Sequence, residues 1–333
     1  MKNRILLYFL VLVSIFSCKK DIAEFKPTNP FENTLVIEKQ FFDLDTLTNQ
    51  IITGEKGTKI YFNREDFDIN ENDKVTLELK EYYNRLELIS DNLNTVTNKN
   101  ELLESNGVIY LNLKVGDKKI NLKKDKKLRI EFAQKFRKGD RIYNGVLDSL
   151  NQITWIDDKE TYISFPVFDS VSTRQFGGVE TYMNKIISID SLDYYSQLNI
   201  DMLSDATSEL YIINWWDYPS ILISNLGWIN VDKIIEPDGI ISYELNLNQS
   251  ELDNVSTFLI YQDLNSFISD YRQPNNLKFT EIPIKNKTSL VVIAKKRTDI
   301  YANRILLNKN TIGNLEIELK KTDSTELEKL LKK

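Results

Sequence analysis

The chain of 333 residues contains no histidine and only one cysteine, Cys18. Without histidine, a Ser-His-Asp or Cys-His catalytic group, a histidine zinc site and a histidine pH switch are excluded. Glycine is also scarce, with 11 residues, and no GxGxxG, GxxxxGK[ST] or GxSxG motif occurs. A nucleotide-binding glycine loop and a hydrolase nucleophile elbow are therefore not expected.

No basic cluster in the sequence is strong enough for nucleic-acid binding. There are 43 lysines and arginines against 49 aspartates and glutamates, which gives a formal net charge of −6. A nucleic acid is bound through a basic patch that attracts phosphates, so we expect no nucleic-acid partner. Apolar residues make up 41% of the chain, which is enough for real hydrophobic cores. A chain of this length suggests about two domains.

The N-terminus carries one long apolar run. Lys2 and Arg4 precede residues 5–16, a run that is short for a spanning helix of about 20 residues and fits the apolar segment of a secretory signal. The residues Ile15-Phe16-Ser17-Cys18 resemble a bacterial lipobox, in which cleavage leaves the cysteine as the acylated first residue. The alternative is an ordinary cleaved signal or an N-terminal anchor helix, with Cys18 incidental. Charge directly after the cysteine and the lack of a second spanning run argue against that alternative.

The lipobox resemblance implies a lipoprotein that carries palmitate or a similar acyl chain on Cys18. Two or more chains give nearly permanent membrane anchorage, because each buried methylene contributes about 0.8 kcal/mol. Acylation also consumes the chain's one thiol. Lys19-Lys20-Asp21 resembles the charged export signal of Bacteroidetes-type surface lipoproteins, so we expect the outer membrane, with surface and periplasmic faces both open. The expected order is a signal peptide at 1–17 and a tether at 18–34.

From residue 35 onward the pattern is that of strands and turns. Residues 74–79 (KVTLEL) alternate strictly, and Gly116-Asp117 between two β-rich runs is typical of a hairpin. Asp323 and Glu326 form a capping-box pair before a leucine stripe. We predict a mainly β chain with two antiparallel β-sandwich-like domains and a short C-terminal helix. The predicted division is a first domain at 35–150, a connecting region at 151–235 and a second domain at 236–333.

Several stretches of the first domain resemble one known sandwich. They are GTKIY from Gly57, KVTLELKE from Lys74, LNTVT from Leu93, LESNG from Leu103 and the VIYLNL hairpin that follows. Together they cover roughly residues 50–135 and look like the domain shared by zonula-occludens, netrin-receptor and ankyrin proteins, in versions similar to those of Bacteroidetes-type envelope proteins. The resemblance implies protein contacts without chemistry, and likeness of fold names no partner.

A second resemblance lies further along the chain, in residues 226–232 (LGWINVD). This stretch is similar to a signature found between the two halves of the same envelope proteins, and we interpret it as a structural junction. The strand-rich region after it is comparable with carboxypeptidase-regulatory-like modules.

The densest aromatic cluster is the candidate binding platform. It consists of Trp215, Trp216 and Tyr218, with Trp228 nearby. Flat aromatic faces stack on sugar rings, so these four residues could receive a glycan or a protein partner. Neighbours in a strand point to opposite faces, so one of Trp215 and Trp216 should lie in a core or at a domain junction. Packing in a core or junction is the simpler interpretation of the whole cluster.

Acidic residues give no strong candidate for a metal or for hydrolysis. Residues 68–73 resemble part of a calcium loop, but Asp73 and Leu79 stand where such a loop has glycine and glutamate. Asp157 and Asp158 could act as paired carboxylates, although adjacent acids are common in turns. Five Asp-Ser or Asp-Thr triplets resemble the O-glycosylation sequon of Bacteroidetes-type exported proteins, and the same pairs favour turns and caps. The triplets begin at residues 45, 148, 169, 190 and 323.

These observations favour one hypothesis over two alternatives. We expect a non-catalytic cell-envelope lipoprotein, attached to the membrane by lipid, that acts as an interaction or scaffold component with a protein or glycan partner. No cofactor and no metal are expected. The first alternative is a glycan-binding accessory lipoprotein of an outer-membrane uptake system. The second is a histidine-free carboxylate hydrolase.

Overall fold

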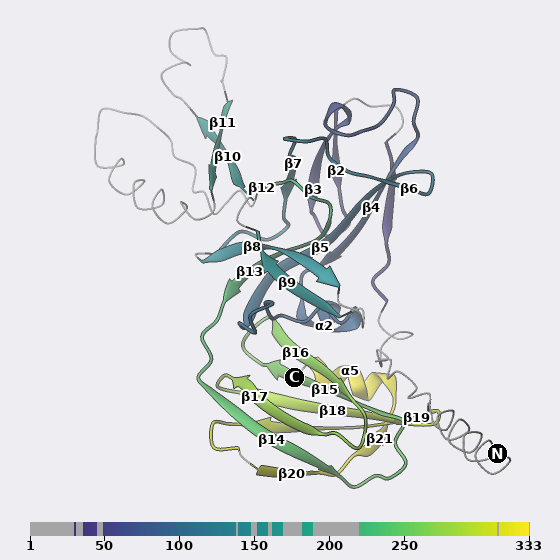
Figure 1. Cartoon of the computed structure of the whole chain (residues 1–333), viewed down its shortest axis with the longest axis vertical. Helices are drawn as coiled ribbons and strands as arrows, with labels where there is room; N and C mark the ends of the chain where they lie inside the picture. The colour runs from purple at the N-terminus through teal and green to yellow at the C-terminus, as the bar shows by residue number, and fades with distance from the viewer. Residues whose placement is uncertain are drawn as a thin grey trace, which may run out of the picture.

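The computed structural model describes residues 30, 36–44, 49–137, 139–147, 152–158, 162–168, 182–188, 220–311 and 313–332, with the backbone alone for 162–168 and 182–188. Within these residues four β-sheets stack in two pairs, and a cluster of apolar side chains joins the pairs (Figure 1). The prediction of a mainly β chain with antiparallel sheets and a short C-terminal helix is confirmed.

The first domain contains two sheets. Sheet A runs in the order β1-β4-β5-β13-β8-β9, with β6 also paired to β5, and sheet B runs in the order β11-β10-β12-β7-β3-β2. The strands of sheet A are β1(Gln40–Asp43), β4(Val75–Tyr82), β5(Leu103–Val115), β6(Lys118–Ile120), β8(Asp140–Leu147), β9(Ile153–Asp157) and β13(Gly227–Ile234). Those of sheet B are β2(Asn49–Thr53), β3(Lys59–Asn63), β7(Leu128–Glu131), β10(Tyr162–Phe168), β11(Tyr182–Ser188) and β12(Ser220–Ile223).

Sheets A and B share a core of alternating apolar residues. Leu77 and Leu79 of β4 belong to the same buried cluster as Ile60 of β3 and Ile130 of β7, and all four side chains are fully buried. The strict alternation of the run KVTLEL puts these leucines on one face of the strand. Residues between them, such as Glu78, point to the opposite face of sheet A.

A buried carboxylate fixes the turn between β2 and β3. Glu81 accepts hydrogen bonds from the backbone N–H groups of Lys56 and Thr58, both at 3.0 Å, and from the side-chain amide of Gln40 at 2.9 Å. Gly54 leaves space for this contact, because a Cβ there would lie 2.5 Å from Glu81 Oε2. Three donors compensate the cost of burying this carboxylate.

The second domain contains a three-stranded sheet and a five-stranded sheet. The first has the order β17-β14-β20, in which β14 and β20 are parallel, and the second has the order β16-β15-β18-β19-β21. The strands are β14(Gly239–Leu247), β17(Lys278–Ile284) and β20(Gly313–Ile317) in one sheet, and β15(Asn254–Tyr261), β16(Ser266–Arg272), β18(Thr288–Lys296), β19(Asp299–Leu307) and β21(Lys320–Thr322) in the other. The helical segments of the described chain are η1(Arg64–Asp66), α2(Arg85–Ser90) and α5(Ser324–Lys332).

The strand β18 is buried on both faces. Leu290 and Val292 belong to the core of the second domain, whereas Val291 and Ile293 belong to the cluster that joins the two domains. This explains why its sequence, SLVVIA, is a continuous apolar run rather than an alternating one. The five-stranded sheet therefore lies between the three-stranded sheet and the first domain (Figure 1).

The described strands of residues 151–235 belong to the first domain, which corrects the expected connecting region. β9 and β13 are strands of sheet A, and β12 is a strand of sheet B. β13 pairs with β5 from Gly227 opposite Leu111 to Ile234 opposite Leu103. The two strands are far apart in sequence, and pairing of this kind leaves no local pattern from which it could be predicted.

Two local predictions are confirmed by the backbone. Gly116 has a φ of +57° in the turn that pairs Val115 with Lys118, so the hairpin uses the conformational freedom of glycine. At the start of α5 the Glu326 N–H donates to Asp323 Oδ1 at 2.9 Å, which is the expected N-cap. Leu327 and Leu331 of the predicted stripe are each 1% exposed.

Candidate functional site

Of the four predicted platform residues, the structure describes Trp228. It lies on β13, whose side chains alternate: Ile229 and Val231 enter the core of the first domain, while Trp228, Asn230 and Asp232 lie on the opposite face of sheet A. Part of that face is covered by the second domain. Trp228 in the stretch LGWINVD therefore packs against the cluster that joins the two domains. Trp215, Trp216 and Tyr218 lie outside the described residues.

Trp228 is the middle member of a row of three aromatic rings. Its ring centroid lies 5.8 Å from that of Tyr82 and 4.9 Å from that of Tyr110, both with tilted planes. Tyr82 is fully buried, whereas Trp228 and Tyr110 are half-buried. The ammonium of Lys39 lies 5.9 Å from the centre of the Tyr110 ring. The row thus passes from the junction to a partly open face that carries a tyrosine, a tryptophan and a cation.

Gly145 on the neighbouring strand β8 makes room for this row. It is paired with Trp228, and a Cβ at residue 145 would lie 2.6 Å from Trp228 Cβ and 2.7 Å from both Ile153 Cδ1 and a ring carbon of Trp155. Distances this short do not occur between real side chains. Glycine is therefore required so that Trp228 and Trp155 can pack against the same backbone.

A carboxylate and two lysines flank the open end of the aromatic row. Glu78 is 5% exposed and accepts from the side-chain amide of Asn112 at 2.9 Å and from Lys114, while Lys39 lies 3.6 Å away. Burial alone would raise the pKa of Glu78, but the hydrogen bonds from Asn112 and Lys114 and the charge of Lys39 outweigh it, so the pKa is lowered. Burial and the charge of Glu78 raise the pKa of Tyr110, so its hydroxyl stays protonated.

Behind the row, Asp232 is enclosed within the protein. It is fully buried, its Oδ2 accepts from Asn230 Nδ2 at 2.6 Å, and its Oδ1 has no hydrogen-bond partner. Burial raises the pKa of Asp232 to about 7, against the opposing effect of hydrogen bonds from Asn230 and Ser105. A buried carboxylate of this kind is more stable with a proton than without one.

Ser105, which is opposite Asp232 in the β5–β13 register and donates to Asn230 Oδ1 at 3.4 Å, also joins the two domains. Its backbone N–H donates to the carbonyl of Asn265 at 2.9 Å, and the Asn265 side chain donates back to the Ser105 carbonyl at 3.0 Å. Asn265 lies in the turn between β15 and β16. Asp232 is therefore separated by one residue, Ser105, from two hydrogen bonds that cross the junction.

A further link between the domains is the loop that contains Asn94 and Thr95. The Thr95 N–H donates to the carbonyl of Phe267 at 3.1 Å, and the Phe267 N–H donates to Thr95 Oγ1 at 2.8 Å. The side-chain amide of Asn94 bonds to the backbone of β16 in the way that a neighbouring strand would. Its Oδ1 accepts from the Ser269 N–H at 2.6 Å, and its Nδ2 donates to the Ser269 carbonyl. This loop, part of the run LNTVT, thus covers the free edge of β16.

Arg85 of α2 forms another link across the junction. Its guanidinium donates to the carbonyl oxygens of Tyr261 at 2.8 Å and Leu264 at 2.9 Å in the second domain. Arg304 donates to the carbonyl of Leu330 near the end of α5 at 2.6 Å. Burial and the charge of Arg304 lower the pKa of Arg85. Two cations near the C-terminal end of α5 suit the negative end of its dipole.

The acidic candidates form ordinary structural contacts. Asp157 lies 3.6 Å from Arg141, and Asp158 accepts from Asn144 at 2.9 Å, so the two carboxylates have different partners. In the segment 68–73, Asp73 accepts from the Asn70 N–H at 2.8 Å. No group of three metal-ligating side chains occurs among the described residues.

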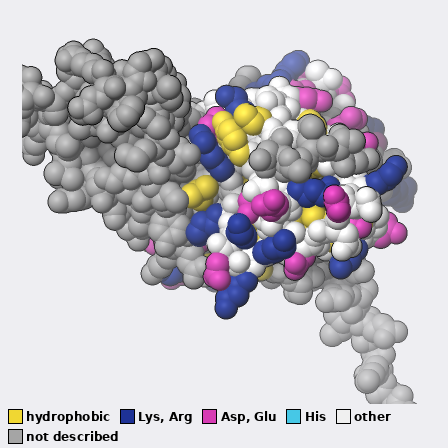
Figure 2. All heavy atoms as spheres, turned by 90° about the horizontal axis from the view of Figure 1, so that it is seen from above, with side chains coloured by type: hydrophobic (Ala, Val, Ile, Leu, Met, Phe, Trp, Pro, Cys, Tyr) yellow, Lys and Arg dark blue, Asp and Glu magenta, His cyan; other side chains and the backbone are white. Residues whose placement is uncertain are grey.

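Charges of both signs are mixed on the end of the molecule that the first domain forms. Figure 2 views this end, and the described lysine and arginine side chains on that face are interspersed with aspartate and glutamate. The helices that the structure describes are all too short and polar to cross a membrane, and Cys18 lies outside the described residues.

The junction contacts of Arg85, Asn94 and Thr95 were not identified from the sequence, and neither was the burial of the Asp232 carboxylate. One signal was available for Asp232: two polar residues, Asn230 and Asp232, alternate with apolar ones in a strand otherwise suited to burial. Comparison with protein-family models, curated proteins and solved structures gives no significant match.

Proposed function

We propose that this chain is a non-catalytic lipoprotein of the outer membrane that serves as an interaction or scaffold component. The lipobox-like residues around Cys18 support the anchor, and residues 18–34 serve as the tether. The observation that carries the scaffold role is the buried junction, in which apolar side chains of both domains form one cluster. A rigid body of two sandwiches suits a protein that holds a partner at a fixed distance from a membrane.

Affinity purification from native membranes tests this proposal. The chain, tagged at its C-terminus and extracted in mild detergent, should retain a stoichiometric envelope protein, and Cys18→Ala should lose that partner because it is released from the membrane. Purification of the native chain alone, or a hydrolytic activity that copurifies with it at constant specific activity, would contradict the scaffold role.

The aromatic row favours a second candidate, a glycan-binding accessory lipoprotein of an uptake system. Tyr110 and Trp228 are half-buried beside Asn112, Glu78 and Lys114, a combination of flat rings and hydrogen-bonding groups that suits a sugar.

A glycan array read together with tryptophan fluorescence tests the second candidate. Tyr110→Ala should abolish a positive signal, whereas Ile240→Ala, an apolar residue of the second domain at 66% exposure, should leave it unchanged. An array without a signal, or one that responds equally to both variants, would remove this candidate.

A further inference from the structure

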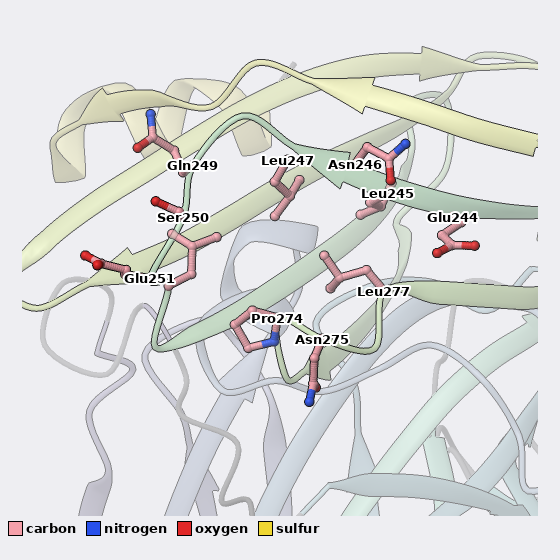
Figure 3. Close-up of a pocket in the computed structure, with 11 residues that line it drawn as sticks. Glu244, Leu245, Asn246, Leu247, Gln249, Ser250, Glu251, Pro274, Asn275 and Leu277 are labelled. Atoms are coloured by element: carbon pink, nitrogen blue, oxygen red, sulfur yellow. The ribbon is translucent and has the colours of Figure 1, made fainter.

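A groove of about 500 Å³ opens at one end of the second domain, away from the junction. It lies between the loop that joins β14 to β15 and the loop that joins β16 to β17, and Figure 3 shows Leu247 and Leu277 between these loops. Leu252 and Pro274 add further apolar surface, and the remaining lining residues are polar. No described residue that lines the groove is aromatic, so the ring stacking typical of sugar recognition is not available there.

The backbone of β14 is open toward the groove at Leu247. The Leu245 N–H donates to the Leu277 carbonyl at 3.0 Å, but the pairing of β14 with β17 ends at Glu244 opposite Lys278. Asn248 donates to β20 on the other side. Because backbone groups alternate between the two edges of a strand, the N–H and C=O of Leu247 point to the same side as those of Leu245. That side is the groove.

The charged side chains that line the groove are both carboxylates, Glu244 and Glu251. The side chain of Glu251 is 79% exposed, and its contact to Lys296 is 3.5 Å long, so it is available to a second cation. Lys278 is opposite Glu244 in the strand register, so Glu244 has a cation beside it. Charge complementarity therefore selects a partner with a basic group near Glu251.

We propose that this groove binds an extended peptide segment of a protein partner, with an apolar side chain against Leu247 and Leu277 and a lysine or arginine at Glu251. The segment adds to β14 as a short strand and forms backbone hydrogen bonds with Leu247. This inference rests on the proposed interaction role and names the class of partner, but it does not depend on the lipid anchor.

Fluorescence anisotropy with synthetic peptides tests the inference. The probe is a labelled heptapeptide of alternating lysine and leucine, compared with its glutamate-leucine counterpart, on residues 19–333, which contain every residue that the structure describes. We expect saturable binding of the lysine peptide and about tenfold weaker binding of the glutamate peptide, with the difference reduced by added salt. A single N-methyl group on the peptide backbone should abolish binding when it is placed at every second position and should have no effect at the positions between them.

Two matched variants locate the site. Glu251→Lys should weaken binding about fivefold, the upper range for one exposed ion pair. Asp117→Lys makes the same charge change on the exposed β5–β6 turn and should leave binding unchanged. If Glu251→Lys lowers the unfolding temperature, Glu244→Lys replaces it.

The proposal is overturned if the two peptides bind equally or not at all, if N-methylation has no alternating effect, or if an oligosaccharide displaces the peptide. Any of these results would remove the groove as a site. Acylation of Cys18, measured separately on the native chain, would leave the lipoprotein proposal standing.

Discussion

At the scale of single residues, sheet A of the first domain buries carboxylates whose burial is favourable only when they carry a proton. Asp232 is enclosed with one oxygen unpartnered, next to Asn230 and Ser105. The nearby Asp140 is 4% exposed, and burial raises its pKa against the opposing effect of Arg137. Tyr143, buried on the same face, has no hydrogen-bond partner for its hydroxyl. Protonation of Asp232 removes a charge from this region and should stabilise the fold.

Replacement of Asp232 by asparagine should make stability less dependent on pH. The folded pKa of about 7 exceeds the unfolded value of about 3.9, so the stabilising effect of the proton is complete below about pH 4 and is lost as the pH rises to about 7. At about 1.4 kcal/mol per unit, Asp232→Asn should gain a few kcal/mol over the native chain at pH 8 and little at pH 4. Urea unfolding at both pH values measures this, with Asp117→Asn as an exposed control. An unchanged pH slope would contradict it.

The close packing around Gly145 gives a second prediction at this scale. Gly145→Ala places a methyl group within 2.7 Å of Trp228, Ile153 and Trp155, and should destabilise the chain by about 1–3 kcal/mol and shift the tryptophan emission. Gly239→Ala is the matched control, since its nearest neighbour atom lies 3.7 Å away. Equal effects of the two substitutions would show that residue 145 is not tightly packed.

At the scale of elements, the loop with Asn94 and Thr95 replaces a strand at the edge of β16. An edge strand presents unpaired N–H and C=O groups that invite aggregation, and this loop satisfies them. Trp155 reinforces the loop, because its indole N–H donates to the Asn94 carbonyl at 2.6 Å. One short segment of the first domain thus stabilises an edge of the second.

Asn94→Ala should destabilise the chain by about 2–3 kcal/mol, because the Ser269 N–H loses its partner in a buried place. Hydrogen exchange should increase at β16 more than at β18. Asn98→Ala removes an amide from an exposed position of the same loop and is expected to have little effect. If the two variants have equal stability, the Asn94 side chain does not link the domains.

The elements that could be predicted from sequence are those that local chemistry determines. Gly116-Asp117 specifies a hairpin, Asp323 caps a helix, and the run SLVVIA specifies a buried strand. The placement of β13 between β5 and β8 could not be predicted, because it depends on pairing across long stretches of chain. Asn94 could not be identified either. An asparagine whose side-chain amide bonds to the backbone of a neighbouring strand has the same sequence signature as an asparagine in a turn.

At the scale of the whole molecule, three apolar clusters run in series through the described residues. The first and third are the cores of the two domains, and the second joins them. The joining cluster contains more buried side chains than the core of the second domain. It includes Phe258 and Phe267 of the second domain together with Tyr82 and Trp155 of the first.

The two domains should therefore unfold together. Differential scanning calorimetry is expected to give a single transition, because exposure of the joining cluster would leave the second domain without support for a large part of its apolar surface. Two well-separated transitions in the native chain would contradict a rigid junction. Asn94→Ala should separate the transitions if it weakens the junction more than either core.

The proposed envelope role depends most on Cys18, because it requires that the two domains be attached to a membrane. Intact-mass spectrometry of the chain purified from membranes tests this most directly. We predict a chain that begins at Cys18 and carries the mass of the attached acyl groups, which is absent from Cys18→Ala. A chain that begins elsewhere, or that carries no acyl mass, would contradict the account.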